Sequence, residues 1–202
     1  MLREHVFDSV LRRRLLSLDI ASPAELPGLD LPAGNFACFL AWDARGDSES
    51  EQELLANGRQ RRQAMRQKAS ERLYHRFLLS LSAEDVSALI EPLLRAGASY
   101  FVCWGPDCER VHDIIDETLS YSGNDFGVPD ESCIMTTWHD SEPLREALRF
   151  FLANCWPEEH YEDSTTVALA ISVGSSAWAM KIAEALDHPR EFVERAAESG
   201  AT

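Results

Sequence analysis

The sequence predicts an α/β fold with three layers: a mostly parallel sheet of about four strands flanked by helices, with an N-terminal helical extension. Four short apolar runs, most of them closed by turn residues, alternate with longer segments in which apolar residues recur at helical spacing. The run over residues 35–42 is apolar at nearly every position, which is typical of a strand covered by helices on both faces. Strands that alternate with helices favour a parallel sheet.

The clearest strand prediction is residues 99–104, where aromatic, β-branched and small side chains precede Gly105 and Pro106. Pro106 suits the first turn of a helix, because its missing N–H costs nothing there. The turn would lie at the carboxyl edge of the sheet, where ligands usually bind in open α/β folds. The four predicted strands cover residues 35–42, 99–104, 133–137 and 165–173.

The chain divides into an N-terminal segment, residues 1–34, and a single α/β domain, residues 35–202. The first segment is predicted to hold an amphipathic helix over residues 4–18, followed by a connector rich in proline and glycine. The domain carries a basic helical insertion at about residues 49–81. Further helices are predicted over residues 82–96, 106–119, 143–152, 177–186 and 190–197.

Charge is distributed unevenly along the chain. The 202 residues carry a formal net charge of −15. Residues 1–102 hold 13 Lys and Arg against 14 Asp and Glu, whereas residues 103–202 hold 6 against 20. A field of that sign repels nucleic acid and anionic membranes and attracts basic proteins. We therefore expect a basic protein partner, and neither nucleic acid nor a membrane.

Other features predict a cytoplasmic protein without a cofactor. No apolar run approaches the roughly 18 residues that span a bilayer, and the N-terminus lacks the continuous apolar segment of a secretory signal. The five cysteines are an odd number, and three lie in apolar runs, as small buried side chains do. No Cys or His pairs stand at zinc spacing, so we expect neither a disulfide framework nor a metal site.

A basic segment interrupts this acidic chain. Between Arg59 and Arg76, seven basic residues stand against one acid, and apolar residues fall four apart, which predicts an amphipathic helix over about residues 60–79. The helix suits pairing with the acidic half of the same chain or of a second copy, so a homodimer is an open alternative. Nucleic-acid binding is the less favoured interpretation, because the charge of the whole chain opposes it.

The residues that follow the four predicted strands could together form an enzyme active site. Cys108, near a helix N-terminus where a thiolate is favoured, would be the nucleophile, and His139 would be the base. Asp140 or Asp43 would orient the histidine, and the amides of residues 175–176 would bind an anion. Each of these residues also has a structural interpretation, as a helix cap or a satisfied polar side chain. No phosphate-binding or nucleophile-elbow motif supports catalysis, so the enzyme is the alternative function.

Two acidic segments favour an interaction surface instead. Residues 122–131 and 156–163 combine carboxylates with large aromatic side chains. Aromatic residues set among charges are the kind that anchor protein interfaces. The predicted partner-binding residues are Asp125, Phe126, Asp130, Glu131, Trp156, Glu158, Glu159, Tyr161, Glu162 and Asp163.

These patterns favour a non-enzymatic, acidic interaction protein: an inhibitor of the immunity or antitoxin type that binds and blocks a basic protein such as a nuclease toxin. The alternative is a small-ligand-binding or hydrolytic enzyme built on Cys108 and His139. The segments WGPDCERVHD and TTWHD resemble an uncharacterised family of bacterial domains of unknown function, over about residues 99–195. The resemblance implies no activity and assigns no residue a role.

Overall fold

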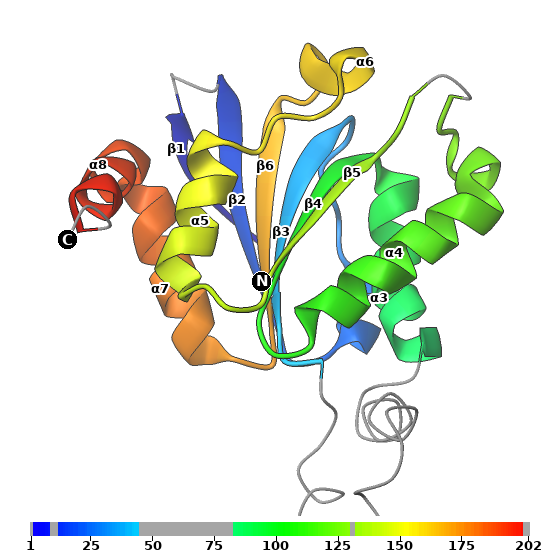
Figure 1. The fold of residues 1–202 in the computed structure, drawn as a ribbon, viewed down its shortest axis with the longest axis horizontal. Coiled ribbons are helices and arrows are strands. Elements are labelled where there is room, and N and C mark those ends of the chain that lie inside the picture. The colour runs from blue at the N-terminus through cyan, green and yellow to red at the C-terminus, as the bar shows by residue number, and fades with distance from the viewer. Residues whose placement is uncertain (1, 9–11, 45–82, 130–131, 200–202) are drawn as a thin grey trace, which may run out of the picture.

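A six-stranded sheet forms the middle layer of the protein, and helices pack on both of its faces (Figure 1). This computed structural model describes residues 2–8, 12–44, 83–129 and 132–199. The strands lie in the order β1-β2-β6-β3-β4-β5 across the sheet. Their bounds are β1 (Leu2–Asp8), β2 (Arg13–Ile20), β3 (Phe36–Trp42), β4 (Ala98–Trp104), β5 (Met135–His139) and β6 (Val167–Val173).

The sheet is mostly parallel, as predicted, but it has six strands and not about four. Strands β2, β6, β3, β4 and β5 pair in parallel, whereas β1 pairs antiparallel with β2. The four predicted strands are β3 to β6, and each lies within two residues of its expected position. The two additional strands come from the N-terminal segment.

The predicted helix over residues 4–18 is wrong, because residues 4–8 lie in β1 and residues 13–18 lie in β2, which pair as antiparallel strands. Apolar side chains three and four residues apart fit a helix, but residues 16–20 also alternate at the strand period, with Leu16, Leu18 and Ile20 buried. Burial in the sheet outweighs the helix propensity of leucine. The N-terminal helical extension is therefore two strands of the main sheet.

Two predictions fall on residues that the structure does not describe. The basic helical insertion at residues 49–81 and the helix expected within it, residues 60–79, lie wholly outside the described ranges. The homodimer alternative depends on this helix and stays a prediction for the same reason.

The helices cover the two faces in two groups (Figure 1). Helices η1, α3 and α4 pack on one face, and α5, α7 and α8 pack on the other. The bounds are η1 (Pro23–Gly28), α3 (Ala83–Ala96), α4 (Cys108–Ser122), η2 (Gly123–Phe126), α5 (Leu144–Ala153), α6 (Glu159–Glu162), α7 (Ser176–Asp187) and α8 (Pro189–Ser199).

The sheet separates two apolar cores. Strands β3 and β6 are buried along their whole length, and their successive side chains point to opposite faces. Cys38 and Leu40 belong to the core beneath α3 and α4, whereas Ala37 and Phe39 belong to the core beneath α5 and α7. This alternation explains why the sequences of these strands are apolar at nearly every position.

The strand order gives the sheet two different edges. From β3 the chain continues through α3 to β4 and through α4 to β5, with both helices on the same face. Helix α5 then crosses the opposite face, and the chain returns to β6 between β2 and β3. The five parallel strands therefore end at one edge, the carboxyl edge, and the loops that precede them lie at the amino edge.

Candidate functional site

The carboxyl edge brings together the segments that hold the predicted enzyme residues. Asp43 follows β3, Cys108 begins α4 just after β4, and His139 ends β5. The backbone N–H of Ala44 donates to the carbonyl oxygen of Pro106 at 3.1 Å, which joins the loops after β3 and β4. These three segments therefore follow neighbouring parallel strands at the same edge of the sheet.

The structure does not pair the thiol of Cys108 with the imidazole of His139. The Cys108 side chain belongs to the core beneath α3 and α4, while the His139 ring lies 4.8 Å from the ring of Phe150 in α5, on the opposite face. Nδ1 of His139 lies 2.9 Å from Oε2 of Glu142. Cys108 hydrogen-bonds with the backbone of His139 and not with its ring. The two groups are not placed for proton transfer.

Burial raises the pKa of the Cys108 thiol above its ordinary value, and the nearby Asp140 carboxylate adds to this rise. Backbone hydrogen bonds from His139 and Gly105 oppose it and are outweighed. The thiol sits at the start of α4, but at 1% exposure the loss of hydration exceeds the help of the helix N-terminus. The expected thiolate is therefore not favoured.

The serines after β6 have a structural role at the start of the helix that follows them. Ser175 is the N-cap of α7, and its Oγ accepts the backbone N–H of Trp178 at 3.3 Å. Strands β3 and β4 separate β6 from β5, so this turn lies about 14 Å from His139 at a strand spacing of roughly 4.8 Å. An anion held at residues 175–176 would be out of reach of that histidine. The helix cap expected at residues 140–141 is also wrong, because Pro143 precedes α5 without a side-chain cap.

The described part of the chain shows no grouping of metal ligands. Within it, no three or more His, Cys, Asp and Glu side chains gather closely enough to hold a metal ion. Across the same ranges, no helix combines the length and the apolar character needed to cross a bilayer.

The burial of the cysteines predicts a simple pattern of thiol reactivity. Cys133 is exposed, whereas burial raises the pKa of Cys38, Cys103, Cys108 and Cys155, for Cys155 to about 12. We expect one thiol to react rapidly with dithiobis-nitrobenzoate in the native protein and five after denaturation. Cys133→Ser should abolish the rapid phase. A rapid phase that survives in Cys133→Ser and disappears in Cys108→Ala would instead demonstrate a reactive Cys108 thiolate.

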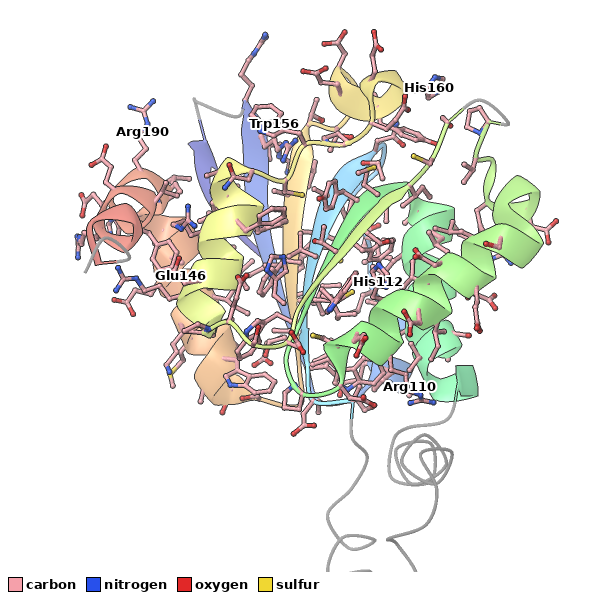
Figure 2. All side chains as sticks on the ribbon, viewed as in Figure 1. Arg110, His112, Glu146, Trp156, His160 and Arg190 are labelled. Carbon is pink, nitrogen blue, oxygen red and sulfur yellow. The ribbon has the colours of Figure 1, made fainter. Side chains whose placement is uncertain are left out.

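The two acidic segments lie in the connections that lead into β5 and β6. Segment η2 follows the end of α4, and α6 lies between α5 and β6, so both precede a strand (Figure 1). Oγ of Ser132 donates to Oη of Tyr161 at 3.3 Å, across a separation of 29 residues. Figure 2 shows Trp156 and His160 at this same end of the molecule. The hydrogen bond of Ser132 joins the loop before β5 to α6, although Ser132 itself lies outside the acidic segment 122–131.

Seven of the ten predicted partner-binding residues are at least partly exposed. Trp156 is 50% exposed and lies beside the exposed carboxylates of α6. Phe126 is half-buried, with the guanidinium of Arg95 5.0 Å from its ring centre. These seven residues are Asp125, Phe126, Trp156, Glu158, Glu159, Glu162 and Asp163, and the five of them in residues 156–163 are named here the amino-edge surface.

The other three residues do not contribute to the described surface. Tyr161 is only 8% exposed, so its ring is part of the interior and not an anchor for a partner. Asp130 and Glu131 lie outside the described residues. Glu158 has a structural role as well, because its carboxylate accepts the backbone N–H of His160 at 3.0 Å and caps α6.

The Trp156 ring packs against Arg13, whose burial the sequence did not indicate. Arg13 is 2% exposed, and its Nη1 donates to the carbonyl oxygen of Cys155 at 2.8 Å. Its guanidinium lies 5.5 Å from the centre of the Trp156 ring, within the range of a cation–π contact. Arg13 falls within the helix that was wrongly predicted over residues 4–18. Strand alternation, with Arg13 and Leu15 on one buried face, is the signal that locates it.

The fold and its surfaces define a three-layer α/β domain with a mostly parallel sheet and an acidic amino edge. The chain belongs to the DUF7684 family, a domain of unknown function, whose model matches residues 79–189. The match extends from just before α3 to the start of α8 and includes the whole amino-edge surface. Neither a curated protein nor a solved structure matches the chain.

Proposed function

We propose that this chain acts by binding, with the amino-edge surface engaging a basic protein partner. An inhibitor of the immunity or antitoxin type, which blocks a basic toxin such as a nuclease, suits such a surface. The charge of residues 103–202, 6 Lys and Arg against 20 Asp and Glu, supports long-range attraction of that partner. The encounter takes place in the cytoplasm and needs no cofactor.

The observation that supports the proposal is the exposure of the carboxylates of Glu159, Glu162 and Asp163, which precede β6 at the amino edge. Trp156 stands half exposed at the same edge, as an aromatic residue among carboxylates. Interfaces often combine a central aromatic anchor with charges around it. Because Arg13 lies against the ring, Trp156 loses little side-chain freedom when a partner covers it.

Neutralising the carboxylates of α6 is expected to slow association with the partner about tenfold at low salt, and to weaken its dependence on ionic strength. The reason is that exposed charges mainly steer the encounter. Stability of the free protein should change little, because these side chains are exposed. The measurement is the association rate, at two ionic strengths, with a basic protein that co-purifies from the host. The variant combines Glu159→Gln, Glu162→Gln and Asp163→Asn.

A matched control separates local charge from net charge. It removes the same number of exposed carboxylates from α7 and α8, away from the amino-edge surface. Association that slows equally in both triple variants would reflect net charge alone and would contradict the proposal. The control combines Glu184→Gln, Glu191→Gln and Glu194→Gln.

Truncating the anchor is expected to act on dissociation instead. Trp156→Ala should weaken binding by about 2 kcal/mol, or roughly 30-fold in Kd, mostly through faster dissociation. Trp156→Phe keeps an aromatic face over Arg13 and should retain most of the affinity. Thermal unfolding of both variants checks that the free protein is intact. A dissociation rate unchanged in Trp156→Ala would exclude this residue as the anchor.

A further inference from the structure

Outside the amino-edge surface, a serine, a histidine and an aspartate lie in one hydrogen-bonded line. Nε2 of His5 lies 2.7 Å from Oγ of Ser17, and Nδ1 lies 2.8 Å from Oδ1 of Asp187. The three residues come from β1, β2 and the end of α7. The His5 side chain is 0% exposed, whereas the Asp187 side chain is 35% exposed. This is the order of groups that activates the serine of Ser–His–Asp hydrolases.

The hydrogen-bond partners of His5 determine which proton positions in the cluster suit catalysis. The hydrogen bond from His5, with a smaller contribution from Arg3, holds the pKa of Asp187 below its ordinary value. The carboxylate is therefore ionised at neutral pH and can only accept hydrogen bonds. Nδ1 of His5 faces this carboxylate, and in the tautomer with the proton on Nδ1 the Nε2 atom accepts the hydroxyl proton of Ser17. Nη2 of Arg3 lies 3.0 and 2.7 Å from the two Asp187 oxygens and fixes the carboxylate.

The backbone is irregular where His5 lies. The pairing of β1 with β2 is regular up to Glu4, and its register shifts between Glu4 and Phe7. Bulges of this kind re-aim side chains and are over-represented beside active sites. Here Val6 is left 49% exposed while the His5 ring is fully enclosed.

Ser17 also lines a cavity of about 240 Å³ beside α7. Most ligand sites measure about 300–1,000 Å³, so this cavity suits a small group such as a short acyl chain. Ser176 lines it from the first turn of α7, where backbone N–H groups lack intrahelical acceptors. The apolar side chains of the wall are Leu18, Ala179, Met180, Ile182 and Ala183.

We propose that Ser17 and His5, positioned by Asp187, hydrolyse small carboxylic esters. Oγ of Ser17 attacks the ester carbonyl carbon and gives its proton to Nε2 of His5. The ester C–O bond breaks, and the alcohol leaves with that proton, which produces an acyl-serine. Water then attacks the acyl carbon and gives a proton to His5, which returns it to Ser17 as the carboxylic acid leaves. His5 and Ser17 lie outside residues 79–189, whereas Asp187 and the α7 wall of the cavity lie within them.

The test exposes the full chain to a fluorophosphonate, which labels activated serines, and to p-nitrophenyl acetate. We expect mass spectrometry to find the adduct on Ser17, and ester turnover to fall by about 100-fold or more in Ser17→Ala. His5→Gln should lose both the label and the turnover. Asp187→Asn should lower kcat more than it changes KM, as expected of a positioning residue. Ser120→Ala, an exposed serine of α4, is the control and should match the wild type.

Two results would overturn the inference. The first is the absence of an adduct on Ser17 with equal turnover in the wild type and Ser17→Ala, which would mean that the cluster only fastens β1 to β2 and α7. The second is labelling of Ser17 that persists in a folded His5→Gln variant, because the reactivity would then not depend on the histidine. Ser17→Ala removes a single oxygen atom, so it serves as the test even where His5→Gln fails to fold.

Discussion

Replacing Gly105 with alanine is expected to destabilise the protein by about 3 kcal/mol or more. Gly105 has φ +119°, which L side chains rarely adopt. A Cβ atom at this position would lie 2.4 Å from the backbone oxygen of Trp42, so the turn after β4 would have to move away from β3. The same turn supplies the Gly105 carbonyl that accepts the N–H of Cys108 at 3.1 Å. The measurement is the free energy of unfolding in denaturant.

Substitutions at two other glycines distinguish the cost of backbone strain from the cost of the steric clash. Gly34 has φ +87° and no atom within 4 Å of an added Cβ, so Gly34→Ala isolates the backbone strain and should cost about 1 kcal/mol. Gly28 has open space and no positive φ, so Gly28→Ala should change stability by less than about 0.5 kcal/mol. A Gly105→Ala variant as stable as Gly34→Ala would show that the turn shifts at no cost.

Truncating Arg13 to alanine is expected to cost about 2–4 kcal/mol of stability, although arginine is commonly a surface residue. The variant loses the hydrogen bond to the Cys155 carbonyl, the contact beneath Trp156 and the volume of a side chain that is 2% exposed. The carbonyl of Cys155 would be left without its donor in a buried position. Thermal and denaturant unfolding measure the loss.

The neighbouring arginine provides the control. Arg14 is exposed and pairs with Glu4, also exposed, at 3.0 Å. Pairs of this kind contribute little, because water screens them and two long side chains must be held in place. Arg14→Ala should therefore leave the free energy of unfolding nearly unchanged. Equal losses in Arg13→Ala and Arg14→Ala would contradict the buried role of Arg13.

Most of the fold could be predicted because apolar residues recur at different spacings in its strands and in its helices. Residues 36–42 are buried on both faces and read as a continuous apolar run. Helix α5 buries Leu144, Ala147, Leu148 and Phe151 at the spacing of one helix face. The N-terminal hairpin could not be predicted in this way, because its leucines satisfy both periods. Pairing with β6, near the other end of the chain, decides between them.

The sites were harder to predict, because they depend on the face that each side chain takes. Strand order placed Cys108 and His139 at one edge, but the register of β5 beside β4 directs the histidine ring toward α5. Burial of Tyr161 follows from its contact with Ser132, which no periodicity reports. His5 and Asp187 are 182 residues apart in sequence, so no local motif could have indicated their hydrogen bond.

Because the sheet divides the interior into two cores, it affects which amino-acid substitutions the chain can accept during evolution. The two cores share no side chain, although strands such as β3 contribute to both. Substitutions that lack common neighbours act independently on stability, whereas those in contact require compensation. Repacking beneath α5, α7 and α8 can therefore proceed without matching changes beneath α3 and α4. Substitutions can therefore accumulate in one core while selection preserves the residues of the other core. The two cores can then diverge at different rates.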